Sequence, residues 1–141
     1  MKIFETRYTT DDAASLKEII LSGDLGFGKN VSVLEEAFKS FSKKNYNIAT
    51  NSASSAAYMI FAYLKEKHGV CDVYITTLGF VSPAWAAKQL GHNIIFVDIE
   101  KDLLFSSRSY KALRKSKNSK NKIVLMPVLY GGVGNISHWD P

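Results

Sequence analysis

The sequence predicts an α/β fold in which a largely parallel sheet is covered by helices on both faces. Short β-rich runs occur at residues 46–50, 73–77, 94–97 and 123–128. Segments with apolar residues at helical spacing alternate with these runs, and turn-forming residues separate the two kinds of segment. Strands that alternate with helices at this spacing need right-handed crossover connections, and therefore a largely parallel sheet.

The composition is that of a single globular domain. Of the 141 residues, 46% are hydrophobic and 22% are charged, which is ordinary for a soluble protein. No apolar run approaches the roughly 20 residues of a membrane span. The N-terminal residues 1–7 lack the long apolar region of a signal peptide. We therefore expect a cytoplasmic protein that has no membrane partner.

The positive net charge of the chain is local. Residues 108–122 contain seven Lys or Arg and no acid, so the rest of the chain carries −2 of the net +5. A polybasic segment can bind phosphates, those of nucleic acids included. Tyr110 is its only aromatic residue, however, and a solvated connection between elements is the alternative. Nucleic acid is therefore not an expected partner.

Neither a disulfide nor a metal site is expected. Cys71 is the only cysteine and cannot form an internal disulfide. The histidines His68, His92 and His138 show no ligand spacing with Cys71 or with each other.

The first 30 residues predict a helix and a glycine-rich loop. A short amphipathic helix is expected from Asp11 or Asp12 to Ser22, because acids stand at its start and Gly23 follows its end. Three of the six residues 23–28 are glycine, and residues 23–30 are expected to form a loop. Their order, G-x-x-G-x-G without a preceding strand, is not a dinucleotide-binding motif. We place a domain division after residue 30.

A second helix and a first strand follow. Ser32 and Glu35 have the spacing of a capping box at a helix start, and an apolar stripe continues from there to about Lys44. A short strand is expected from Tyr46 to Thr50.

The turn after this strand, residues 51–55, consists of small residues and leads into a third helix. Apolar residues of that helix share one buried face, namely Ala56, Ala57, Ile60, Phe61 and Leu64. Free N–H groups at a helix start, together with serine hydroxyls, favour a bound anion such as phosphate. In the alternative, Ser52 or Ser54 simply caps the helix.

The remaining segments continue the alternation. A strand is expected from Val73 to Thr77, and Ser82 is expected to cap a helix that has Pro83 at its first position and stops at Gly91. The run from Ile94 to Val97 is apolar throughout, which predicts a strand covered on both faces.

The last segments complete the predicted sheet. One or two helical turns are expected at residues 109–115, and a fourth buried strand from Ile123 to Val128. In parallel sheets, ligands bind beyond the carboxyl ends of the strands. The segments expected at that edge are residues 51–55, residues 76–82, Asp98 and residues 129–135.

Six segments, in order, resemble the N-terminal half of the DegT/StrS-type sugar aminotransferases, which are pyridoxal-phosphate (PLP) enzymes of the aspartate-aminotransferase fold (fold type I). The segments are Gly23 to Gly28, Leu34 to Phe38, Asn51 to Ala56, Thr76 to Ser82, Phe96 to Ile99 and Pro127 to Gly131. The resemblance spans nearly the whole chain, and six ordered segments are more specific than any one of them. It implies that residues 31–141 are part of the large PLP-binding domain.

The resemblance also implies roles for four residues. The turn with which the family holds the cofactor phosphate falls on Ser52, Ala53 and Ser54, and the aromatic residue that stacks on the pyridine ring falls on Phe80. A flat apolar side chain can cover a π-system. In the alternative, Phe80 is an ordinary core residue. The loop at residues 23–28 would face the substrate near a subunit boundary.

The sequence departs from the family pattern in several places. Ala53 and Ser54 replace a glycine and a threonine of the phosphate turn, and Leu129 and Tyr130 follow Pro127-Val128 where the family has a histidine. The chain given stops at Pro141, before the family's pyridine-pairing aspartate, its Schiff-base lysine and its C-terminal domain.

These departures leave no residue to which we assign a catalytic role. Asp98 matches a different family position, Lys88 lies within a helix, and Asp140 follows the fourth strand too closely to match the pyridine-pairing aspartate. PLP chemistry needs both of the absent groups, the carboxylate and the lysine.

Two main hypotheses follow. In the first hypothesis, the chain is the N-terminal portion of a PLP-dependent aminotransferase for nucleotide-linked keto sugars. It is inactive alone, and its partners are a second copy or a complementing C-terminal half. The second is a non-enzymatic interaction or phospho-ligand-binding module derived from that fold. A third hypothesis, which the sequence supports less, is nucleic-acid binding through residues 108–122. Truncation would leave apolar surface uncovered on residues 94–97 or 123–128, so we also expect self-association or a marginal fold.

Overall fold

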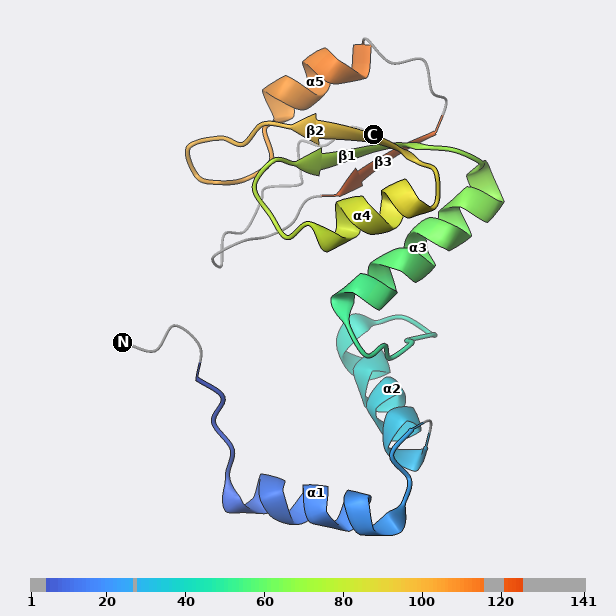
Figure 1. Cartoon of the computed structure of the whole chain (residues 1–141), viewed down its shortest axis with the longest axis vertical. Helices are drawn as coiled ribbons and strands as arrows, with labels where there is room; N and C mark the ends of the chain where they lie inside the picture. The colour runs from blue at the N-terminus through green and yellow to red at the C-terminus, as the bar shows by residue number, and fades with distance from the viewer. Residues whose placement is uncertain (1–4, 27, 116–120, 126–141) are drawn as a thin grey trace. The chain divides into compact units, whose positions relative to one another are not determined.

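The computed structural model describes residues 5–26, 28–115 and 121–125 (Figure 1). The chain divides into two compact units, Met1–Ala49 and Thr50–Pro141. The domain division expected after residue 30 stays a prediction. Among the described residues, no helix combines the length and the apolarity that crossing a bilayer requires.

The first unit begins with helix α1, Thr10–Ser22, which confirms the helix predicted there. Thr9 caps it: the Thr9 hydroxyl accepts a hydrogen bond from the N–H of Asp12 at 3.2 Å, and the Asp12 carboxylate accepts one from the N–H of Thr9 at 2.8 Å. Gly23 ends the helix with φ of 74°, a left-handed conformation that glycine adopts without strain.

The cap of α1 makes its stability depend on pH. Hydrogen bonds from the Thr9 side chain and backbone hold the pKa of Asp12 below its ordinary value. A lowered carboxyl pKa stabilises the helix above the ordinary pKa, and this contribution is lost as the pH falls through the lower folded value. We expect NMR titration of the Asp12 carboxyl to show the lowered pKa, and Thr9→Ala to raise it. An unchanged Asp12 titration in Thr9→Ala would contradict the role of this cap.

Helix α2, Lys29–Ser42, starts before the position that the capping-box pattern predicted. Gly28 is its N-cap, so Ser32 lies inside the first turn and the predicted capping box is wrong. The Glu35 carboxylate instead accepts a hydrogen bond from the backbone N–H of Ala49 at 2.8 Å. A β-carbon at Gly28 would lie 2.6 Å from the Asp24 carboxylate, which would have to move to make room for it.

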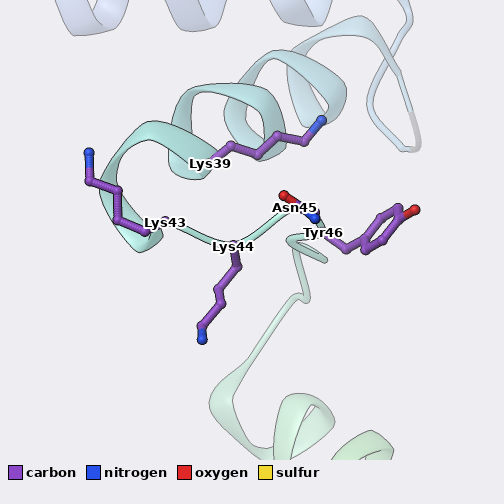
Figure 2. A pocket seen from close by; sticks show the side chains of 5 residues that line it. All are labelled: Lys39, Lys43, Lys44, Asn45 and Tyr46. Carbon is purple, nitrogen blue, oxygen red and sulfur yellow. The ribbon is translucent and has the colours of Figure 1, made fainter.

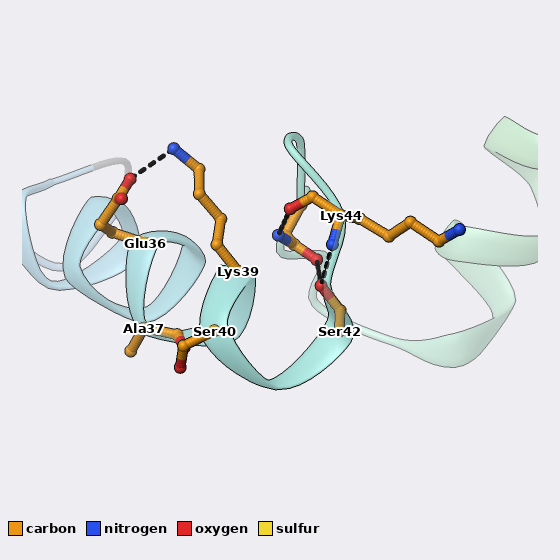
Figure 3. Close-up of polar contacts among 7 residues, drawn as sticks. Glu36, Ala37, Lys39, Ser40, Ser42 and Lys44 are labelled. Atoms are coloured by element: carbon orange, nitrogen blue, oxygen red, sulfur yellow. Dashed lines mark hydrogen bonds and ion pairs between the residues drawn. The ribbon is translucent and has the colours of Figure 1, made fainter.

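The strand predicted from Tyr46 to Thr50 is wrong, because these residues have no regular secondary structure. Side chains and main chain at the end of α2 bond to each other (Figure 3). The Ser42 hydroxyl donates to the Asn47 side-chain oxygen at 2.8 Å, and the Asn47 amide donates to the carbonyl of Lys44 at 3.3 Å. No described strand pairs with this segment. A β-rich sequence needs such a neighbour to become a strand.

The second unit contains the sheet and its helices. Helix α3, Ala53–His68, leads to strand β1, Asp72–Thr76, and helix α4, Ser82–Gln89, leads to strand β2, Asn93–Val97. Helix α5, Ser107–Lys115, and strand β3, Lys122–Leu125, follow. The sheet order is β2-β1-β3, and both pairs are parallel, with Val73 aligned to Ile94 and to Ile123. The predicted parallel α/β architecture is confirmed.

Helices lie on both faces of this sheet (Figure 1). On one face, Tyr74, Ile95 and Val97 form a buried cluster with Phe105, which precedes α5, and with Tyr110 of α5. The Tyr74 and Tyr110 rings meet edge to face with centroids 5.0 Å apart. The period-2 alternation of strand side chains thus gives β1 a separate hydrophobic core on each side.

The core on the other face joins α3 and α4 to β1. Phe61 of α3, Val73 of β1, and Ala86 and Ala87 of α4 form it. The small alanine side chains of α4 let this helix lie close to both neighbours. The predicted helices around residues 56–64 and 84–90 are confirmed in type and position.

Strand β2 is covered less than its apolar sequence predicted. Ile95 and Val97 are buried, but Phe96 on the opposite face is 58% exposed, so the expectation of cover on both faces is wrong. The physical reason is the position of β2 at the edge of the sheet, where α4 covers only part of that face. Exposed apolar surface on residues 94–97 was expected and is present.

Two further expectations concern helix starts and strand ends. Val81 is the N-cap of α4 and makes no side-chain cap bond, so Ser82 is the first helical residue rather than the predicted cap. The predicted fourth strand is confirmed over residues 122–125, and its continuation lies outside the described residues. The glycine-rich segment at residues 130–134 and Asp140 also lie outside the described residues.

Candidate functional site

The turn before α3 is fixed by a network of small polar side chains. Ser52 is the N-cap, and its hydroxyl accepts a hydrogen bond from the N–H of Ser55 at 3.1 Å. The hydroxyl of Ser55 in turn donates to the Asn51 side-chain oxygen at 2.7 Å. Ser52 therefore caps the helix, as one of the two alternatives predicted, and Asn51 and Ser55 hold the cap in place.

Two backbone N–H groups at this helix start have no acceptor in the part of the chain that the structure describes. Those of Ala53 and Ser54 make no hydrogen bond among the described residues, whereas the N–H of Ser55 bonds to the cap. The carbonyl of Ser52, which belongs to the same peptide group as the Ala53 N–H, accepts hydrogen bonds from the Thr50 hydroxyl at 3.0 Å and the Ala56 N–H at 3.1 Å. These two bonds fix the plane of that peptide, and with it the direction of the Ala53 N–H.

This donor set fits a phosphate group. It consists of the Ala53 and Ser54 N–H groups and the Ser54 hydroxyl, at the positive end of a 16-residue helix. Unpaired N–H groups and the helix dipole both favour a negative charge at this position. The small side chains of residues 51–55 leave room for a phosphate to approach the backbone.

Phe80 lies in the loop between β1 and α4. It is 77% exposed, so the alternative that it is a core residue is wrong. Figure 1 shows α3 and α4 with their N-termini at the same end, toward which β1 points. The Ser52–Ser54 turn and the loop of Phe80 therefore both belong to the carboxyl end of the sheet, where parallel α/β folds bind ligands. Stacking of Phe80 on a ligand ring stays a prediction.

Other residues expected near this edge make local bonds. The Thr76 hydroxyl donates to the carbonyl of Leu78 at 2.6 Å, and the Asp98 carboxylate accepts from the N–H of Ile99 at 2.8 Å. Lys88 is exposed on α4. The described residues contain no cluster of His, Cys, Asp or Glu that could hold a metal ion.

His92 has a structural role that the sequence did not reveal. Its Nδ1 accepts a hydrogen bond from the N–H of Cys71 at 3.1 Å, and its Nε2 lies 3.0 Å from the carbonyl oxygen of Phe61. Because Nδ1 is the acceptor, Nε2 carries the proton and donates to Phe61. A single buried imidazole therefore connects α3, the start of β1 and the turn before β2. No local pattern around a lone histidine indicates contacts with partners 21 and 31 residues away.

The amino end of the sheet contains a second buried polar group. Asp72 is buried, and one of its carboxylate oxygens accepts a hydrogen bond from the Asn93 side chain at 2.9 Å, across the β1–β2 pair. The other oxygen is buried without a partner among the described residues. Burial, and secondarily the charge of Asp72, raises the pKa of the adjacent Cys71 thiol. Cys71 is therefore a buried, unreactive thiol in the folded chain.

A basic hollow of about 630 Å³ lies in the first unit (Figure 2). Lys39, Lys43, Lys44, Asn45 and Tyr46 line it. Lys39 already forms an ion pair with Glu36 one turn earlier in α2 (Figure 3). Lysines around the end of α2 complement the negative end of the helix dipole, which explains this cluster without a ligand.

Comparisons with known proteins show related sequences. The sequence profile of the DegT/DnrJ/EryC1/StrS aminotransferase family matches residues 7–141. A UDP-4-amino-4,6-dideoxy-N-acetyl-beta-L-altrosamine transaminase of Campylobacter jejuni subsp. jejuni serotype O:23/36 (strain 81-176) is 32% identical over 118 residues. The match covers 84% of this chain and 30% of that transaminase, so the chain spans less than a third of this relative.

Solved structures show the same fold. Helicobacter pylori PseC, an aminotransferase involved in the biosynthesis of pseudoaminic acid, superposes with a TM-score of 0.72 at 24% identity. The superposition covers 86% of this chain and 32% of that chain. An E. coli GDP-4-keto-6-deoxy-D-mannose-3-dehydratase with bound hydrated PLP gives a TM-score of 0.72 at 16% identity, over 86% of this chain and 32% of that chain.

Proposed function

The chain belongs to the DegT/DnrJ/EryC1/StrS aminotransferase family, and on that premise we propose that it forms the phosphate-binding part of a PLP-dependent enzyme that aminates nucleotide-linked keto sugars. The matched relative is named as a transaminase of a UDP-linked sugar, which supports this substrate class. The proposal places the protein in glycan precursor biosynthesis in the cytoplasm, with a nucleotide sugar as the substrate of the complete enzyme.

One observation carries the proposal. The N–H groups of Ala53 and Ser54 have no acceptor among the described residues, and they lie beside the Ser54 hydroxyl at the start of α3. A phosphate monoester such as that of PLP would receive hydrogen bonds from these donors and from the positive end of the helix. Phe80, exposed at the same end of the sheet, would cover the attached ring.

PLP, when bound, supplies an electron sink for the chemistry of the amino group. The residues of this chain would bind and orient the cofactor through its phosphate and ring. The family's lysine and pyridine-pairing aspartate match no residue of this chain, so we propose that it does not catalyse transamination alone. A chain that carries the family's C-terminal half would then complete the enzyme.

Titration with PLP tests the proposal. We expect weak, saturable PLP binding to the full chain, followed by the quenching of protein fluorescence, and we expect inorganic phosphate to compete with it. We also expect no turnover of an amino donor. Steady transamination by the chain alone would contradict the proposed inactivity. Binding of many phosphorylated compounds without preference for PLP would instead favour a phospho-ligand-binding module.

Phe80→Ala gives a separate prediction about the cofactor ring. Aromatic stacking contributes about 0.5–1.5 kcal/mol, so the variant should weaken PLP binding about 2- to 10-fold. Binding of inorganic phosphate should stay unchanged, because phosphate has no ring to stack. The thermal melting temperature should also stay unchanged, since the side chain is mostly exposed. Equal loss of PLP and phosphate binding would show that Phe80 acts by shaping the turn.

A further inference from the structure

His92 is a buried titratable side chain whose two ring nitrogens both bond to the backbone. The residue is 5% exposed. Its Nδ1 accepts a hydrogen bond from the N–H of Cys71 at 3.1 Å, and its Nε2 donates one to the carbonyl of Phe61 at 3.0 Å. The backbone N–H of His92 bonds to the carbonyl of Ala87 in α4 at 3.0 Å. One residue therefore connects α3, α4 and the start of β1.

The contacts of the ring require the neutral form of the imidazole. A proton added to Nδ1 would turn this acceptor into a donor, and it would face the N–H of Cys71, which is a donor as well. That N–H would then be buried without its acceptor. Among the described residues, the carbonyl of Phe61 would be the hydrogen-bond partner left to the buried positive charge.

Helix α3 brings positive rather than negative charge to His92. The ammonium group of Lys65 reaches the turn between α4 and β2, which ends at His92. Successive helical residues turn by about 100°, so His68 lies within about 20° of Phe61 around the helix, whereas Glu66 lies about 140° from it. Glu66 is the only acid of α3, and it belongs to another side of the helix.

The described residues of α4 and β1 place no carboxylate beside the ring either. Lys88, in the last turn of α4, lines a hollow together with His92. Asp72 bonds to Asn93, and its side chain alternates along β1 with that of Val73, which packs against α3 and α4. The Asp72 carboxylate therefore lies on the opposite face of the sheet. The charges on the side of His92 are positive, and like charges disfavour a protonated imidazole.

We propose that His92 is a pH-sensitive latch, which holds α3 to the start of β1 when it is neutral and releases α3 when it is protonated. A histidine in an open or unfolded chain takes up a proton near pH 6.5. The closed form has no place for this proton, so the open form binds more protons below that pH. The closed form therefore loses stability as the pH falls, and above about pH 7 the latch contributes in full.

Labelling of the Cys71 thiol tests the latch. Cys71 is buried, is the only cysteine of the chain, and carries the N–H that His92 holds. The full chain with His68→Ala and His138→Ala keeps His92 as its only histidine, and it is labelled with an aromatic disulfide at pH 5 and at pH 7. Each rate is divided by the rate of the urea-unfolded chain at the same pH, which removes the effect of pH on the thiol itself. The ratio measures the fraction of open chains.

We expect this open fraction to rise about 25-fold from pH 7 to pH 5, the effect of one proton that only the open form takes up near pH 6.5. His92→Asn in the same background is the variant that cannot titrate, since its side-chain oxygen can replace Nδ1 as the acceptor. Its open fraction should be larger at pH 7 and should change less than about threefold between the two pH values. An equal pH dependence with and without His92 would overturn the inference.

NMR of the unsubstituted chain gives a second test that does not depend on how well a variant folds. We expect the ring nitrogens of His92 in the folded chain to keep the signals of the neutral form, with the proton on Nε2, down to about pH 5.5. Signals of a protonated His92 in a folded chain whose Cys71 N–H stays protected from hydrogen exchange would overturn the inference, because the closed form would then accept the proton.

Discussion

Ala53→Pro is expected to weaken PLP and phosphate binding about 10- to 100-fold while leaving the fold intact. Proline removes one of the two N–H groups at the start of α3 to which the described residues offer no acceptor. A hydrogen bond to a charged group contributes about 1.5–3 kcal/mol, which corresponds to this loss of affinity. The measurement is a titration of wild type and variant with PLP and with inorganic phosphate.

The helix should tolerate this proline. Ala53 is the first helical residue, where proline is favoured because its missing N–H would have no intrahelical partner. The preceding residue, Ser52, has φ of −162° and ψ of 157°, an extended conformation compatible with a following proline. An unchanged melting temperature would show that the loss of binding comes from the lost donor.

Thr10→Pro is the matched control. Thr10 is the first residue of α1, and the Thr9 cap before it is also extended. The control adds a proline at the same kind of position in the other compact unit, so PLP binding should not change. Unchanged phosphate affinity in Ala53→Pro would contradict the assignment of the turn. Equal loss of affinity in both variants would show that the effect is not local.

His92→Ala is expected to lower the free energy of unfolding of the second unit by about 2–4 kcal/mol, because it removes two buried hydrogen bonds and leaves a cavity. The N–H of Cys71 would lose its acceptor, and the carbonyl of Phe61 would lose a donor. The ring also packs against Phe61, with centroids 5.8 Å apart. A loss of this size is a large part of the stability of a small domain. Urea unfolding followed by circular dichroism measures it.

His68→Ala is the control for this prediction. His68 is exposed at the end of α3, and the carbonyl of its backbone, which the substitution keeps, accepts the hydrogen bond from Asn121. Its replacement should change the free energy of unfolding by less than about 0.5 kcal/mol. Similar destabilisation by both substitutions would show that the buried contacts of His92 are not what stabilises the second unit.

Local sequence patterns determined most of the elements. The helices over residues 10–22, 53–68 and 82–89, and the strands around residues 73–76 and 94–97, follow from apolar periodicity together with caps and glycine stops. These signals are strong because their causes lie within one or two turns of chain. The small residues of the turn at 51–55 indicated a helix start open to an anion for the same reason.

The wrong predictions concern features that depend on residues far away in the sequence. Residues 46–50 have the composition of a strand but no described strand to pair with, and Phe96 is exposed because β2 lies at the sheet edge. The start of α2 was misplaced because Glu35 bonds to Ala49 rather than to a cap. Strand pairing and burial are properties of neighbours in space, which a local pattern does not specify.

The sequence by itself determined the parallel α/β class, the order of its elements and the turn of small residues before α3, since each depends on residues close together in the chain. Tertiary structure alone decided that His92 joins α3 to the start of β1, and that no described residue accepts a hydrogen bond from the N–H groups of Ala53 and Ser54. The physical reason is that hydrogen-bond satisfaction and burial depend on which segments meet in space.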